Sequence, residues 1–199
     1  QIFGLPAGKY TYYLFIECTG QEIKYEFEVK GSPSPVFQKE DISCFGANDG
    51  KISIVSGGAS DYLYAVNGAN PISQNALEST KFGPGIYTIV ITNAIGCISQ
   101  TVSLEIQEPQ VLEILNLSSK NNACGSNDGY VDVSWAGGTP NYTINLLESG
   151  KVFASQATAN STIRFSNLGP GNYSIQIIDA SNCQLNSSAS VSIVDGPSE

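Results

Sequence analysis

One segment occurs twice in the chain with almost the same sequence. Residues 83–97 read GPGIYTIVITNAIGC, and residues 169–183 read GPGNYSIQIIDASNC. A looser third copy, LPAGKYTYYLFIEC, occupies residues 5–18. Each copy has a Pro/Gly turn, a tyrosine, an alternating apolar stretch and a final cysteine. Because a segment that recurs at a fixed offset marks a structural unit, the sequence predicts an array of repeats.

The offset between the copies gives the size of the unit. Cys97 and Cys183 are 86 residues apart, whereas Cys44 and Cys124 are 80 apart, so the last unit carries an insertion of six residues. Units of this size suffice for a small β-sandwich with its own core. We therefore divide the chain into the C-terminal part of a repeat folded as a β-hairpin (1–34), one complete repeat (35–110) and a second complete repeat (111–199).

Short strands separated by turns make up each repeat. Residues 23–30, IKYEFEVK, alternate strictly between apolar and charged side chains, as a half-buried strand does. No segment has a convincing apolar period of a helix. The predicted fold class is all-β, with tandem immunoglobulin-like β-sandwich modules. The expected strands are 36–43, 51–56, 62–66, 77–82, 87–92 and 98–106 in the first complete repeat, and 112–117, 130–135, 142–147, 152–157, 162–165, 173–178 and 188–194 in the second.

The tyrosine of the recurring segment has two interpretations. In immunoglobulin-like sandwiches, a tyrosine near the start of a late strand bonds through its hydroxyl to the preceding corner. Tyr87 and Tyr173 are placed for such a tyrosine corner, and Tyr10 is placed similarly. The alternative is that all three are aromatic core residues that favour strands. Neither interpretation makes them catalytic.

Composition narrows the classes of function. The net charge is −9 with only nine Lys and Arg residues, which argues against nucleic acid and anionic lipid surfaces as partners. Histidine is absent, so imidazole bases and histidine metal ligands are excluded. The apolar runs are far shorter than a membrane span, and we expect no membrane insertion. No catalytic residue is singled out, and the chain is not expected to be an enzyme.

Five cysteines lie at equivalent places in the repeats, a pattern typical of disulfides in an oxidising, extracellular compartment. In each complete repeat one cysteine precedes the second strand (Cys44, Cys124), and one follows the tyrosine strand (Cys97, Cys183). Pairing within each repeat, Cys44 with Cys97 and Cys124 with Cys183, treats both repeats alike and is the predicted connectivity. For Cys18 we expect either a partner earlier in a longer chain or a free thiol.

An Asn-Asp-Gly turn follows the first cysteine of each complete repeat. Asp49 and Asp128, with Asp41 or Asp61 nearby, would be oxygen ligands for calcium. One carboxylate per turn is few for such a site, and Asn-Asp-Gly forms turns for geometric reasons alone. We expect no cofactor and no metal, with calcium as the alternative.

The single tryptophan, Trp135, raises the hypothesis of sugar stacking. It alternates with Val131 and Val133, and this parity predicts a core position instead. Other aromatic side chains would then supply an exposed surface for a polysaccharide or protein ligand. The alternative function is therefore a carbohydrate-binding module of a secreted hydrolase. The candidates for the contact surface are Tyr13, Phe15, Tyr62 and Tyr64.

The order of these motifs resembles the SprB repeat. The likeness rests on CFGANDGKISI, GGASDYLYAVNG and FGPGIYTIVITNAIGC in the first complete repeat, and on CGSNDGYVDVSWAGGTPNYTINL and LGPGNYSIQIIDASNC in the second. SprB repeats occur in very large gliding-motility adhesins of Bacteroidota. The resemblance implies an extracellular, cell-surface protein exported by type IX secretion, in which neighbouring repeats of the same chain contact one another and form an adhesin or its stalk. It implies no catalytic residue.

Overall fold

A computed structural model describes residues 5–196 of the chain. The chain forms two compact units whose boundaries differ from those of the sequence repeats. The first unit comprises the residues up to Glu40, Lys51–Thr80 and Ile86–Glu105, and the second comprises Asp41–Gly50, Lys81–Gly85 and the residues from Ile106 onward. The loop 41–50 therefore belongs by sequence to the first complete repeat and by packing to the second unit.

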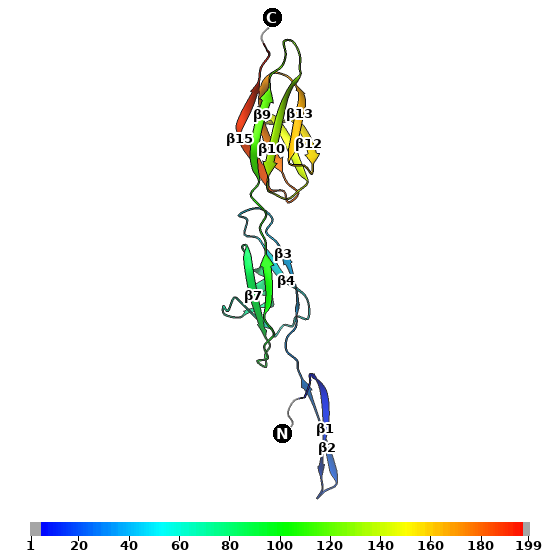
Figure 1. Cartoon of the computed structure of the whole chain (residues 1–199). Helices are drawn as coiled ribbons and strands as arrows, with labels where there is room; N and C mark the ends of the chain where they lie inside the picture. Colours follow the sequence, from blue (N-terminus) through cyan, green and yellow to red (C-terminus); the bar gives the residue numbers. More distant parts are fainter. Residues whose placement is uncertain (1–4, 197–199) are drawn as a thin grey trace. The chain divides into compact units, whose positions relative to one another are not determined.

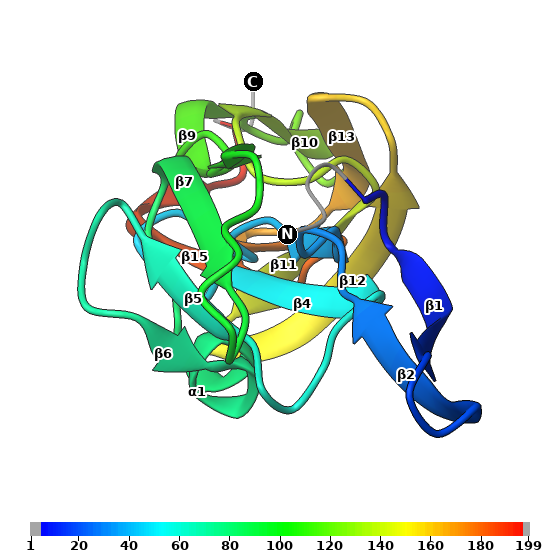
Figure 2. The ribbon, with the colours of Figure 1, turned by 90° about the horizontal axis from the view of Figure 1, so that it is seen from below.

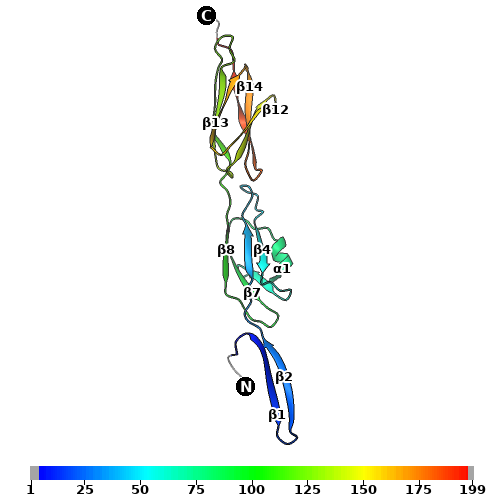
Figure 3. The ribbon, with the colours of Figure 1, turned by 90° about the vertical axis from the view of Figure 1, so that its right-hand side faces the viewer.

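The second unit contains a sandwich of two antiparallel sheets. One sheet has the strand order β13-β10-β9, and the other has the order β12-β11-β14-β15 (Figures 1 and 3). These orders correspond to strands E-B-A and C′-C-F-G of an immunoglobulin-like sandwich. The bounds are β9 Glu113–Lys120, β10 Gly129–Ala136, β11 Tyr142–Glu148, β12 Lys151–Thr158, β13 Thr162–Leu168, β14 Gly171–Ile178 and β15 Gln184–Ile193.

Alternating apolar residues explain why the two sheets close on each other. Val131, Val133 and Trp135 of β10 are buried, whereas the residues between them are partly exposed. The predicted core position of Trp135 is thus confirmed. Each buried side chain of this kind contributes about 1.5–3 kcal/mol to folding. The same core contains Tyr142, Ile144, Leu146, Phe165, Leu168, Tyr173, Ile175, Ile177 and Ile193.

The first unit contains a smaller sandwich. One sheet consists of β3 (Val36–Glu40) and β4 (Lys51–Ser56), and the other has the order β6-β5-β7-β8. The rings of Phe37 and Tyr64 meet edge to face between the sheets, with their centroids 6.3 Å apart. The bounds of the second sheet are β5 Leu63–Val66, β6 Ile72–Ser73, β7 Gly85–Thr92 and β8 Val102–Ile106.

A short helix lies where the sequence predicted a strand at 77–82. α1 (Gln74–Ser79) packs against β4, β5 and β6 and lies beside β6 in Figure 2. The hydroxyl of Ser73 caps the helix by accepting the backbone N–H of Ala76 at 3.3 Å. The strand prediction was wrong because a six-residue helix is shorter than two turns and shows no apolar period in the sequence.

The predicted hairpin is formed by β1 (Gly8–Ile16) and β2 (Gln21–Val29), as Figure 3 shows. Tyr12 lies opposite Tyr25, and their rings stack with centroids 5.0 Å apart. This face of the hairpin is open, since Tyr12 is 43% exposed and Leu14 is 50% exposed. In the second unit, the equivalent face of β14 is buried.

The prediction of an all-β protein with tandem immunoglobulin-like modules is confirmed. Two-sheet sandwiches make up both complete repeats, and α1 is the helix among residues 5–196. Within that range no helix combines the length and hydropathy needed to cross a membrane.

Candidate functional site

The loop 41–50 is anchored by two aspartates. Asp49 accepts the backbone N–H of Ser43 at 2.9 Å and the hydroxyl of the same serine at 2.6 Å. Both hydrogen bonds lower the pKa of Asp49, and the one from the hydroxyl has the larger effect. Asp41 accepts the backbone N–H of Gln107 at 2.8 Å. The loop is therefore held on both sides of its cysteine.

The second repeat builds the same loop from equivalent residues. Asp128 accepts the backbone N–H of Ala123 at 2.7 Å, and Asn121 accepts that of Val194 at 3.1 Å. Hydrogen bonds from the Ser126 hydroxyl and the Ala123 N–H lower the pKa of Asp128, and the hydroxyl has the larger effect. In both repeats, the residue directly before the first cysteine donates its backbone N–H to the aspartate of the Asn-Asp-Gly turn.

A buried polar residue closes the turn that carries the other cysteine. Asp179 is 4% exposed and accepts the backbone N–H of Cys183 through Oδ1 and that of Thr139 through Oδ2, both at 2.8 Å. In the first repeat, Asn93 accepts the backbone N–H of Cys97, also at 2.8 Å. Neither residue was among the predicted site residues. The available signal was a short Asp/Asn at the same place in both copies of the recurring segment.

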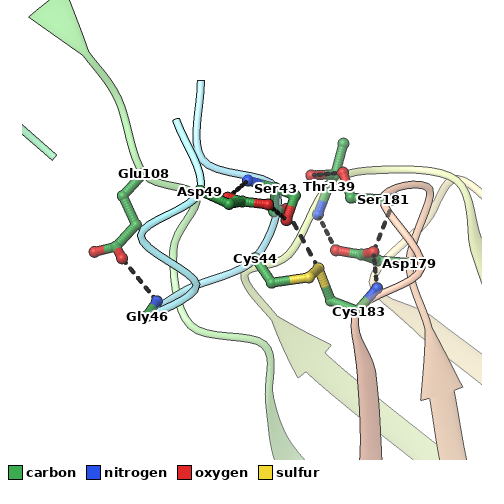
Figure 4. The surroundings of a disulfide bond; sticks show 9 residues. All are labelled: Ser43, Cys44, Gly46, Asp49, Glu108, Thr139, Asp179, Ser181 and Cys183. Carbon is green, nitrogen blue, oxygen red and sulfur yellow. Dashed lines mark hydrogen bonds between the residues drawn. A yellow bond between two sulfur atoms is a disulfide. The ribbon is translucent and has the colours of Figure 1, made fainter. Parts of the chain in front are cut away.

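Cys44, the first cysteine of one complete repeat, forms a disulfide with Cys183, the second cysteine of the other. Their Cα atoms are 5.7 Å apart. Figure 4 shows the bond between the loop 41–50 and the turn at Asp179. The Sγ atom of Cys183 also lies 3.3 Å from the carbonyl oxygen of Ser43. Because Cys44 and Cys183 belong to different sequence repeats, the disulfide is a covalent link between successive repeats.

This bond corrects the predicted connectivity. Cys44 is not bonded to Cys97, and Cys124 is not bonded to Cys183. Cys97 and Cys124 are free thiols, and so is Cys18, which lies exposed in the turn between β1 and β2.

The path of β14 gives the physical reason for this correction. Gly129, at the start of β10, pairs with Leu168, which lies shortly before β14 begins. The loop with Cys124 is therefore at the end of the sandwich where β14 starts. Cys183 follows the far end of this eight-residue strand, at a distance of about 26 Å along it. The two cysteines of one repeat thus lie at opposite ends of that repeat and cannot be bonded to each other.

Two segments of the chain match a family model at residues 36–71 and 116–150, and the family is the SprB repeat. These segments are SprB repeats. Both contain the Asn-Asp-Gly loop and its cysteine, Cys44 or Cys124. SprB repeats are those of a gliding-motility adhesin of Bacteroidota. No curated protein matches the sequence.

Several solved structures are similar to this chain. Extracellular domains 3–5 of Drosophila OTK are 15% identical with a TM-score of 0.41, covering 96% of this chain and 72% of theirs. Sidekick-1 immunoglobulin domains 1–5 are 12% identical with a TM-score of 0.35, covering 95% and 45%. Dimeric latent PorU from Porphyromonas gingivalis is 12% identical with a TM-score of 0.28, covering 97% and 24%. The chain spans less than half of the Sidekick-1 and PorU chains.

The tyrosines of the recurring segment lie near the start of β1, β7 and β14. Tyr173 donates its hydroxyl to the carbonyl of Gly169 at 3.1 Å, and Tyr10 donates to the carbonyl of Pro6 at 2.7 Å. Both contacts join residues four apart, as in a tyrosine corner. Tyr173 is also buried in the core, and this burial raises the pKa of its hydroxyl. Tyr87 is half-buried at the equivalent place on β7. The two interpretations of these tyrosines are therefore compatible.

The candidate contact aromatics fall into two groups. Tyr13 and Phe15 on β1 are 60% and 65% exposed. Tyr64 is fully buried, with its ring against Phe37 of β3. This burial raises the pKa of its hydroxyl. Its assignment to an exposed surface was wrong, because β5 is a run of apolar residues whose alternation does not show which face is buried. Tyr62 is half-buried before β5.

Three of the four candidate calcium ligands accept hydrogen bonds from backbone N–H groups. Asp49, Asp128 and Asp41 hold the loop N–H groups described above, and Asp61 is exposed in the turn before β5. Within residues 5–196, no group of three or more carboxylate, thiol or imidazole side chains lies close enough to hold a metal ion. The geometry thus gives the Asn-Asp-Gly aspartates a role in the loops themselves.

One further polar cluster lies on the outer face of β10. Arg164 donates to both carboxylate oxygens of Asp132 at 2.6 Å and lies 3.8 Å from the ring centroid of Tyr130. The hydrogen bonds from Arg164 lower the pKa of Asp132. The cluster joins β10 to β13 across the sheet, and its donors and acceptors are directed at one another.

Proposed function

We propose that this chain is a structural segment of a large secreted cell-surface protein, in which SprB repeats form an adhesin or the stalk that presents it. The observation that carries the proposal is the Cys44–Cys183 disulfide. It joins successive repeats covalently and encloses all strands from β4 to β14 in one loop. A bond in this position is suited to a protein that transmits tension from a surface to a ligand.

The mechanical role follows from the path of the chain under tension. A pulling force applied to the two termini reaches Cys44 and passes through the disulfide to Cys183. The intervening chain, with a sequence separation of 139 residues, carries none of that force. The strands within the loop are therefore protected from forced unfolding, whereas β1–β3 and β15 remain outside the loop.

Single-molecule force extension of the full chain tests this role. At roughly 3.4 Å per extended residue, the 139-residue separation corresponds to about 470 Å of hidden length. Reduction or Cys44→Ser should increase the contour length by about that amount. Cys97→Ser removes a free thiol and should leave the contour length unchanged. Equal contour lengths for the oxidised and reduced chains would refute the mechanical proposal.

The finer parts of the proposal are location, ligand and motility. An extracellular location agrees with a disulfide and with the surface proteins for which SprB repeats are known. Tyr13 and Phe15 are 60% and 65% exposed, which is the exposure that an adhesive contact needs. Binding of the full chain to a polysaccharide array, lost in Tyr13→Ala with Phe15→Ala, would support an adhesive role. Binding that persists in this variant would contradict the assignment of the contact to these residues.

The proposal includes no catalytic group and no cofactor. Three of the carboxylates that the sequence offered for calcium, Asp49, Asp128 and Asp41, accept backbone N–H groups in the structure. We propose that these hydrogen bonds order the loops without a metal ion. A calcium titration that raised the melting temperature of the full chain would contradict this part of the proposal.

A further inference from the structure

Two of the free thiols occupy the same structural positions as the two bonded cysteines. Cys124 is the second repeat's counterpart of Cys44, and Cys97 is the first repeat's counterpart of Cys183. We call the Cys44 and Cys124 positions front cysteines, and the Cys97 and Cys183 positions back cysteines. Cys124 is exposed and Cys97 is half-exposed, so both thiols are accessible.

The surroundings of the counterparts agree in detail. Before both front cysteines, a backbone N–H is bound by the aspartate of the Asn-Asp-Gly turn, at 2.9 Å in the first repeat and 2.7 Å in the second. Both back cysteines donate their own N–H to a buried Asp or Asn at 2.8 Å. Each free thiol is therefore presented by the backbone geometry that presents a bonded one.

The observed disulfide also indicates which front cysteine pairs with which back cysteine. A front cysteine cannot reach the back cysteine of its own repeat, because β14 or β7 separates the two by the length of the strand. The bond that forms joins the front cysteine of one repeat to the back cysteine of the repeat that follows. Under this rule, Cys124 requires a repeat after residue 196, and Cys97 requires the front cysteine of a repeat before its own.

We propose that Cys124 and Cys97 are disulfide sites for adjoining SprB repeats, so that a longer array is linked by one bond at every junction. In each bond the two thiols lose two protons and two electrons, and a small disulfide such as oxidised glutathione, or a thiol–disulfide oxidoreductase, is reduced to two thiols. The inference deepens the proposed structural role and rests on it. Because successive loops overlap, the array would resist extension along its whole length.

The test is to extend the full chain by one repeat. A second copy of residues 110–196 is joined directly after Gly196, which keeps the spacing of the natural junction between the repeats. The oxidised product is digested without reduction and its disulfides are mapped by mass spectrometry. We expect the Cys44–Cys183 bond and a new bond from Cys124 to the back cysteine of the added copy. The free thiols should remain three in number, although the extension adds two cysteines.

Matched variants distinguish the possible results. Cys124→Ser in the extended chain should leave the added back cysteine as a free thiol, whereas Cys44→Ser should keep the new bond. A Cys124 that stays free, or that pairs with a cysteine of its own repeat, overturns the inference. So does a back cysteine of the added copy that reacts with maleimide as fast in native buffer as in denaturant. Any of these results leaves the contour-length experiment on the original chain unaffected, so the two proposals fail separately.

Discussion

At the level of single residues, the cysteine loops depend on short polar side chains that accept backbone N–H groups. Asp49 and Asp128 do this in the front loops, and Asn93 and Asp179 do it in the back turns. A side chain of this length bonds a backbone N–H nearby in sequence without ordering a long flexible stem. The same backbone shape therefore recurs although the residues between these positions differ.

The low pKa values of Asp49 and Asp128 predict that the protein loses stability in acid. The folded-state pKa values of Asp49 and Asp128 lie below the ordinary value of 3.8. Their contribution is therefore complete above about pH 4 and is lost as the pH falls through the folded pKa values. The double substitution Asp49→Asn with Asp128→Asn should flatten the decrease in melting temperature between pH 5 and pH 2.5. Asp61→Asn, outside the cysteine loops, is the control and should leave the slope unchanged.

Gly137 predicts a large cost for a single methyl group. Its φ is +74°, and an added Cβ would lie 1.8 Å from the carbonyl oxygen of Val111. Gly137→Ala should therefore cost about 3 kcal/mol or more. Gly150 has a similar φ of +75° with nothing within 4 Å of an added Cβ, so Gly150→Ala should cost only about 1–2 kcal/mol. Equal costs in urea denaturation would contradict the close contact with Val111.

At the level of elements, a tyrosine hydroxyl holds the corner at the start of β1 and the corner before β14. Tyr173→Phe removes the hydrogen bond to the carbonyl of Gly169 while keeping the buried ring. We expect a loss of about 1–2 kcal/mol, because a part-buried carbonyl loses its partner. Tyr13→Phe on exposed β1 should change the free energy of unfolding by less than about 0.5 kcal/mol. A loss as small for Tyr173→Phe would show that the corner is held by packing alone.

The sequence predicted the elements best where polar and apolar residues alternate. In β10 the alternation predicted both the strand and the buried side of Trp135. In β5, Leu63–Val66, every residue is apolar, so the burial of Tyr64 was not visible. α1 was missed because six residues are too few to show a helical period.

At the level of the whole molecule, the connectivity of the cysteines could not be deduced from the repeats. Pairing within each repeat treats the repeats alike, and so does pairing each front cysteine with the back cysteine of the next repeat. The second pattern leaves Cys97 and Cys124 unpaired in a chain with two complete repeats, which makes it the less economical choice on sequence alone. What decides between them is the length of β14, which keeps Cys124 and Cys183 at opposite ends of one sandwich.

Because the disulfide spans both repeats, its removal should affect the stability of the whole molecule. With a sequence separation of 139 residues, the loop-closure model gives an upper value of about 5 kcal/mol. For a chain of this length that corresponds to a decrease in melting temperature on the order of 10 °C. Cys44→Ser and Cys183→Ser should each produce this decrease in calorimetry, and the double variant should be no less stable than either, since both remove one bond. Cys97→Ser removes a thiol that is free in this chain and should leave the melting temperature unchanged; a decrease equal to that of Cys44→Ser would place the stabilising bond at Cys97 instead.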